Sequence, residues 1–228
     1  MMPLKAILRT LPLKFIAQGW ASTIGEAIPF FERAIELNAT AMNLHLGHAY
    51  LHDVDKERLV DEAYALAEKY DLPLMLETHR GRITQDLHAT CALVRRRPET
   101  RIALDVSHYL VAGEGVGGDI TRFNVSLGPL FEATELIHGR ISNGQQIQVS
   151  VADTQSVALT QSIWESAMEI WLANAPSNAV FVFEPELGPP PYAYLVRGVE
   201  TYSRTAETDS LVSLAREAWD RAGKSVAV

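Results

Sequence analysis

The hydrophobic and polar positions along the chain follow two alternating patterns. Short apolar runs of strand length predict strands, and longer stretches with apolar residues on one helical face predict helices. The predicted strands are residues 13–20, 41–46, 72–77, 101–107, 135–141 and 179–184. The predicted helices are residues 22–38, 56–70, 84–97, 161–173 and 209–223. Residues 110–131 are glycine-rich and weakly patterned, and we expect a loop with a short helix there.

The predicted strands are mostly apolar on both faces, and helical stretches separate them. This combination is typical of a parallel sheet that is covered by helices, in either a barrel or a doubly wound sheet. The chain has 228 residues, of which 47% are hydrophobic, which suits one sizeable core. We therefore expect an α/β fold in a single domain over residues 1–228.

The number of strands does not match a complete barrel, which has eight strands and typically about 250 residues. If residues 179–184 form the last strand, the first two strands of a TIM-type (β/α) barrel are missing. We therefore expect an incomplete, N-terminally truncated barrel with about six strands. Open sheet edges invite association, so a homodimer or a higher homo-oligomer is expected to cover the gap.

Composition narrows the class of protein. The formal net charge is −8 and the only dense basic run is RRR at 95–97, so no nucleic-acid partner is expected. No apolar run approaches the length of a membrane span, and the N-terminal residues lack the pattern of a signal peptide. A cytoplasmic protein is expected. The single cysteine, Cys91, lies in a helical pattern and is predicted to be a buried small hydrophobe rather than a nucleophile.

Ionisable residues recur where predicted strands end. Glu77 ends LPLMLE, Asp105 lies near the end of RIALD, His138 lies in ELIH, and Glu184 ends AVFVFE. In a parallel barrel the carboxyl ends of the strands face the same side, so these four side chains would converge. Three carboxylates and one imidazole suit a divalent ion such as Mg²⁺, Mn²⁺, Co²⁺ or Zn²⁺.

Four segments together resemble a known family. ETHRGRITQD, LDVSH, IHGR and FEPELGPPPY are similar to segments of the sugar phosphate isomerase/epimerase group of the xylose-isomerase-like TIM-barrel superfamily. Its members typically carry Glu, Asp, His and Glu metal ligands at the ends of strands five to eight. The resemblance covers roughly residues 10–200 and implies that the four strand-end residues are the ligands. It also implies that His108 and Arg140 approach the oxygens of the substrate.

These residue types fit the isomerisation or epimerisation of a sugar or sugar phosphate. A divalent ion that bridges two adjacent oxygens of a ketose stabilises an enediolate. Two carboxylates on opposite faces of the reacting carbon would take and return a proton, and Glu77 and Glu184 are the expected pair. Two alternatives stay open: a metal-dependent dehydratase of keto-sugars or cyclitols, and a non-catalytic protein that binds sugar or metal.

Further residues near the predicted mouth have roles that the sequence leaves open. His79 and Arg80 either contact substrate or support the ligands, and Arg80, Arg82 and Arg140 either bind a phosphate or pair with the acids around them. His45 and His48 end an earlier strand, and a role beside the substrate is expected rather than metal ligation. Ligation by both would indicate an endonuclease-IV-like site, against which the acidic net charge argues.

Overall fold

The computed structural model describes residues 13–115, 119–176, 178–200 and 202–226. Its contacts divide the chain into two compact units, which meet between Gln85 and Asp86. Each unit is described by itself, so the expectation of a single domain stays a prediction. Within the described residues, none of the helices combines the length and the apolar character that a membrane crossing requires.

From residue 13 onward, where its description begins, the first unit contains three parallel strands and two helices in strict alternation. In chain order these are β1 (Ile16–Ala21), α2 (Ile24–Glu36), β2 (Ala41–Leu46), α3 (Asp53–Lys69) and β3 (Leu74–Glu77). β2 pairs with β1 along its whole length and with β3 on its other side. The Thr23 side chain caps α2 by accepting a hydrogen bond from the backbone N–H of Glu26. Phe31 on α2 and Leu44 on β2 are among its fully buried side chains.

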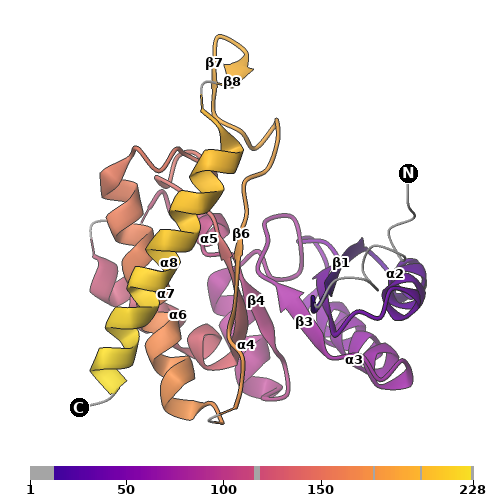
Figure 1. Ribbon diagram of the computed structural model, residues 1–228. Helices are drawn as coiled ribbons and strands as arrows, with labels where there is room; N and C mark the ends of the chain where they lie inside the picture. The colour runs from indigo at the N-terminus through magenta and orange to yellow at the C-terminus, as the bar shows by residue number, and fades with distance from the viewer. Residues whose placement is uncertain (1–12, 116–118, 177, 201, 227–228) are drawn as a thin grey trace. The chain divides into compact units, whose positions relative to one another are not determined.

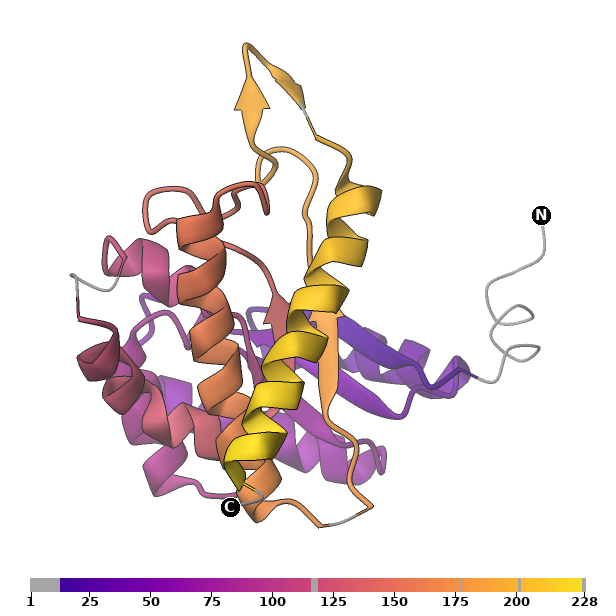
Figure 2. The ribbon, with the colours of Figure 1, turned by 60° about the vertical axis from the view of Figure 1, so that its left-hand side comes forward.

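The second unit has a longer set of elements, in which helices again separate the parallel strands. These are α4 (Leu87–Arg96), β4 (Ile102–Leu104), α5 (Ser107–Ala112), α6 (Ile120–Ala133), β5 (Thr134–Gly139), α7 (Thr154–Asn174), β6 (Val182–Pro185), β7 (Leu195–Val196), β8 (Val199–Glu200) and α8 (Arg204–Val226). β5 lies between β4 and β6 and pairs with both in parallel. α7 and α8 lie side by side in both views (Figures 1 and 2), and β7 and β8 form a small hairpin between β6 and α8.

The predicted strands and helices are present, with one clear error between residues 107 and 133. Residues 110–131, where a loop with a short helix was expected, instead contain the end of α5 and most of α6. α6 has a regular start, because the Asp119 side chain accepts a hydrogen bond from the backbone N–H of Arg122 at 2.9 Å. Its buried face includes Leu127, Leu130 and Phe131. α7 and α8 also begin earlier than predicted, at Thr154 and Arg204.

Candidate functional site

The carboxylate of Glu77, at the end of β3, is the centre of a polar group in the first unit. Glu77 is 1% exposed, and three side-chain nitrogens surround its Oε2 atom. Asn43 Nδ2 and Gln18 Nε2 donate hydrogen bonds at 2.6 and 3.0 Å, and His45 Nε2 lies 2.6 Å away. The strand register explains the grouping, because Gln18 pairs with Asn43 across β1 and β2, and paired residues share a face of the sheet.

His79 completes a candidate metal-binding group with His45 and Glu77. One ligand atom from each of these three residues lies within 4.8 Å of the other two. His79 Nδ1 lies 2.5 Å from the backbone carbonyl oxygen of Arg80. A carbonyl only accepts hydrogen bonds, so in the neutral ring Nδ1 carries the proton and Nε2 keeps its lone pair, the tautomer of a histidine that binds a metal through Nε2. The mixed oxygen and nitrogen donors of this group fit a divalent ion.

The segment after Glu77 is held against the end of β2 by hydrogen bonds. Thr84 Oγ1 donates to the carbonyl of Glu77 at 2.5 Å and accepts from the backbone N–H of His79 at 3.1 Å. Arg82 Nη1 donates to the carbonyl of Gly47 at 3.1 Å. Arg82 therefore stabilises the loop, whereas the Arg80 side chain is exposed. Gly81 makes the turn between them with a φ of 79°, a conformation that favours glycine.

Asp105 follows β4 in the second unit and is fully buried among donors. Its Oδ1 accepts from the backbone N–H and the hydroxyl of Ser107 at 2.9 and 2.5 Å, and its Oδ2 accepts from Arg140 Nε at 3.1 Å. His108 Nε2 lies 3.5 Å from Oδ2. Burial would raise the pKa of Asp105, but Arg140, His108 and His138 hold it well below its usual range. Asp105 is therefore an anion under ordinary conditions.

His138 on β5 lies between two carboxylates that come from the β6 region. Its Nδ1 is 2.9 Å from Glu186 Oε2, and its Nε2 is 3.6 Å from Glu184 Oε2. Glu184 is the register partner of His138 across the two strands. The side chain of Glu184 is 54% exposed, whereas that of His138 is 1% exposed. Both predicted residues therefore lie at the same strand ends, with Glu186 as an additional neighbour.

Arg140 links the acids of the second unit to the loops around them. Besides its bond to Asp105, it contacts Glu186 Oε1 through Nη2 at 2.6 Å and donates from Nη1 to Gln148 Oε1 at 3.0 Å. The Tyr192 ring lies 4.9 Å from its guanidinium carbon. Burial would lower the pKa of Arg140, but Asp105 and Glu186 raise it above its ordinary value. Arg140 is therefore a permanent cation that already pairs with two acids.

The predicted residues thus form one set in each unit. His45, Glu77 and His79 lie together in the first unit. The second unit contains the other set, whose members lie close to one another or to Glu186: Asp105, His108, His138, Arg140 and Glu184. Because the four predicted ligands are divided between the two units, their meeting around one ion stays a prediction.

Among the polar residues that contact these sets, sequence reasoning missed Gln18, Asn43, Gln148 and Glu186. A signal for Asn43 was present, because polar residues alternate with apolar ones in NLHL, as in a strand with one polar face. Gln18 is the polar residue that interrupts the apolar run of its predicted strand. Glu186 stands two residues after Glu184, which equally places it on the same side of an extended chain. Gln148 lies in an irregular segment, where no periodicity points to it.

The described residues contain six parallel strands that alternate with helices over the two units, in an α/β fold of the TIM-barrel type. The solved structure of endonuclease IV from Thermus thermophilus is similar to this chain, with a TM-score of 0.52 and 14% sequence identity. The match covers 95% of this chain and 80% of that one. At this identity the likeness shows the fold alone, and the family that the sequence resemblance implied stays a prediction. No family model and no curated protein matches the chain.

Proposed function

We propose that this protein is a divalent-metal-dependent enzyme that isomerises or epimerises a sugar or a sugar phosphate. The observation that carries the proposal is the group of His45, Glu77 and His79, with ligand atoms within 4.8 Å of one another at the end of parallel strands. The carboxyl ends of barrel strands are where the active sites of TIM-barrel enzymes lie. The sequence resemblance to sugar phosphate isomerases and epimerases supports the choice of substrate.

The acid–base chemistry would fall to carboxylates at the strand ends. Glu77, held by Asn43 and Gln18, is fixed in a position from which it would remove a proton next to a carbonyl group. Glu184 is the predicted partner that returns the proton, and its half-exposed side chain can reach a substrate. A bound divalent ion would supply Lewis-acid stabilisation of the charge that develops on the sugar oxygens. Asp105 and His138 are predicted to complete the ligand set.

The test is metal-dependent exchange of solvent deuterium into a panel of ketoses and ketose phosphates, with Mn²⁺ or Co²⁺ added to the metal-free protein. The wild-type protein is expected to catalyse the incorporation of deuterium into a substrate and the formation of its isomers. Glu77→Gln and Glu184→Gln are expected to lower exchange by about 10²- to 10⁴-fold, the usual contribution of an acid–base group. Glu132→Gln on the exposed face of α6 is the matched control and should behave like wild type.

Three other outcomes would contradict this proposal. Loss of water from the substrate would identify a dehydratase of keto-sugars or cyclitols. Tight metal binding without exchange across the panel would favour a non-catalytic sugar- or metal-binding protein. Exchange that survives both glutamine substitutions would show that the acid–base assignment is wrong.

A second candidate is metal-dependent cleavage of a nucleic-acid backbone. Two imidazoles beside Glu77 favour it, because histidine nitrogens are good zinc ligands, and the similar solved structure is an endonuclease. The net charge of −8 opposes binding to a polyanion. Nicking of plasmid DNA in the presence of Zn²⁺, lost in His45→Ala and His79→Ala, would replace the sugar proposal. Intact plasmid together with ketose exchange would exclude the endonuclease.

A further inference from the structure

Glu186 has no role in the predicted ligand set, yet it lies closer to the His138 ring than the predicted ligand Glu184 does. Glu186 Oε2 lies 2.9 Å from His138 Nδ1, whereas Glu184 Oε2 lies 3.6 Å from Nε2. We propose that Glu186 is a positioning residue that fixes the tautomer and the ring orientation of His138, so that Nε2 is presented to a divalent ion. This inference rests on the proposed function for the identity of the metal site, but its geometry is that of the second unit alone.

The tautomer follows from the chemistry of the two groups. A carboxylate accepts hydrogen bonds and does not donate them, so the short contact to Glu186 requires the proton of a neutral His138 to be on Nδ1. Nε2 then keeps the lone pair that ligates a metal. The separation of 3.6 Å between Nε2 and Glu184 Oε2 is too long for a hydrogen bond. The two atoms therefore lie on the same side of the ring as neighbouring candidate metal ligands.

Glu186 is itself held in place from two sides. Its Oε1 lies 2.6 Å from Arg140 Nη2, and its backbone N–H donates to the carbonyl of Gly139 at 3.1 Å, which extends the pairing of β5 with β6. Arg140 in turn donates to Gln148 Oε1. The imidazole of His138 is therefore oriented by a carboxylate whose own position is determined by a buried cation.

Gln148 connects Arg140 to the segment that follows Glu186. Its Oε1 accepts from the backbone N–H of Gly188 at 2.8 Å, and its Nε2 donates to the carbonyl of Gly188 at 3.1 Å and to the Tyr202 hydroxyl at 2.9 Å. The chain that leaves β6 is thereby tied to the cation that holds Glu186. Carboxylates that orient a metal-binding histidine typically account for about 10- to 100-fold in metal affinity.

The first experiment reads the tautomer directly and needs no metal. Long-range ¹H–¹⁵N spectra of the metal-free protein, with His138 assigned by its loss in His138→Gln, are expected to show a protonated Nδ1 and an unprotonated Nε2. Glu186→Ala should shift the ring towards the opposite tautomer, and Glu186→Gln, which keeps an acceptor oxygen, should preserve the original one. A protonated Nε2 in wild type would overturn the proposal, whatever the variants do.

The second experiment measures the affinity for Mn²⁺ and Co²⁺ by titration calorimetry. Glu186→Ala should weaken binding by about 10- to 100-fold, Glu186→Gln should restore part of this loss, and the exposed Glu132→Gln should have no effect. Unchanged affinity in Glu186→Ala would overturn the inference. A loss that equals that of Glu184→Ala, with an unprotonated Nδ1 in wild type, would also overturn it, because Glu186 would then be a ligand. Absence of metal binding in wild type would instead remove the proposed function, and the tautomer measurement would still decide this inference.

Discussion

At the scale of single residues, the glycine of the IHGR segment, Gly139, is required by the packing of its neighbours. Gly139 stands between His138 and Arg140, and a Cβ atom at this position would lie 2.1 Å from Cζ of Phe183 on the neighbouring strand. The ring of Phe183 crosses β5 at the point where a side chain is absent. The glycine therefore allows β6 to lie close enough to β5 for Glu184 to pair with His138.

Gly139→Ala is expected to destabilise the protein by about 1–3 kcal/mol, because the added methyl group overpacks a well-filled site. Urea unfolding measures the change. Gly128→Ala in α6 is the matched control, since nothing lies within 4 Å of the new methyl group. This control should stabilise the protein by about 0.5–1 kcal/mol, because alanine is the better helix former. Equal effects of the two substitutions would contradict the packing argument.

Cys91 is a second residue whose surroundings determine its chemistry. It is buried on α4, its thiol donates to the carbonyl of Ser126 at 3.3 Å, and burial raises its pKa above the ordinary value. We expect no reaction of the native protein with a thiol reagent at pH 8 and full reaction in denaturant, because the thiolate is the reactive form. Rapid labelling of the native protein would contradict this prediction.

At the scale of elements, the packing of α7 on β6 involves an aromatic pair. Trp164 is completely buried, and its ring meets the ring of Phe183 edge-on with centroids 5.0 Å apart. Such pairs stabilise a protein by about 0.5–1.5 kcal/mol beyond the contribution of the apolar area that they bury. α7 thereby covers the strand that carries Glu184.

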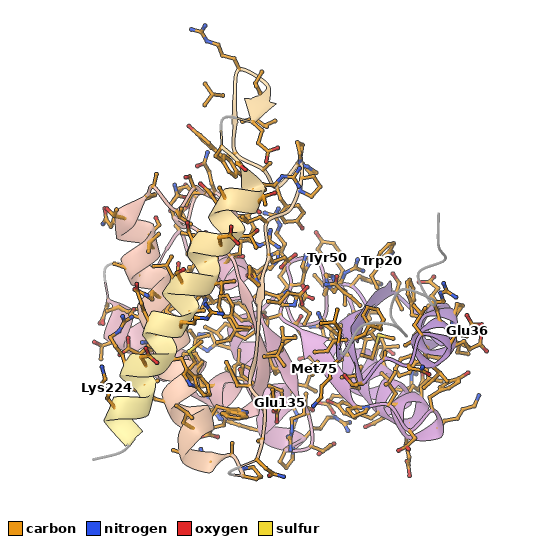
Figure 3. All side chains as sticks on the ribbon, in the orientation of Figure 1. Trp20, Glu36, Tyr50, Met75, Glu135 and Lys224 are labelled. Carbon is orange, nitrogen blue, oxygen red and sulfur yellow. The ribbon has the colours of Figure 1, made fainter. Side chains whose placement is uncertain are left out.

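Trp164→Ala is expected to cost about 3–5 kcal/mol, the usual loss for a fully buried aromatic side chain. Trp20→Ala on β1 is the control, because Trp20 is 64% exposed and, like Tyr50, projects where the strands of the first unit end (Figure 3). The control should change the free energy of unfolding by less than about 1 kcal/mol. A large loss of unfolding free energy in Trp20→Ala with a small loss in Trp164→Ala would contradict the placement of Trp164 in the core.

At the scale of the whole molecule, the four predicted metal ligands are divided between the two units. Mn²⁺ at one hundred times its dissociation constant is expected to raise the free energy of unfolding by about 2.7 kcal/mol, and a chelator should reverse the gain. If one ion takes ligands from both units, Glu77→Gln and His138→Gln should each abolish this Mn²⁺-dependent stabilisation, as measured by thermal unfolding. A gain that survives either substitution would show that the two sets act separately. Glu132→Gln serves as the control and should keep the gain.

The expected homo-oligomer is a prediction at the same scale. A sheet of parallel strands exposes apolar edges unless another element or subunit covers them. Light scattering coupled to size exclusion at micromolar concentration is expected to give a mass of at least twice the 25.2 kDa of the chain. A monomer across the concentration range would contradict the prediction.

Local sequence was sufficient to predict the alternation of strands and helices. The predicted strand at residues 41–46 coincides with β2, and α4 and α2 begin close to their expected starts, because burial imposes a period of two or 3.6 on the side chains. Only one short helix was expected where α5 and α6 lie, because the glycines from position 113 onward and Pro129 weaken the local helical signal. Burial of Leu127, Leu130 and Phe131 outweighs that weakness, and burial is a property of the fold.

The candidate site divides in the same way between sequence and structure. The sequence by itself determined where ionisable side chains end apolar strands, since such residues stand out against an apolar run, and Glu77, Asp105, His138 and Glu184 were all found on this basis. Only the tertiary structure decided their immediate partners: Gln18 and Asn43 at Glu77, and Glu186 at His138. The physical reason is that a hydrogen bond depends on distances between strands, and residues far apart in the sequence reach these distances only after the parallel strands have paired in register.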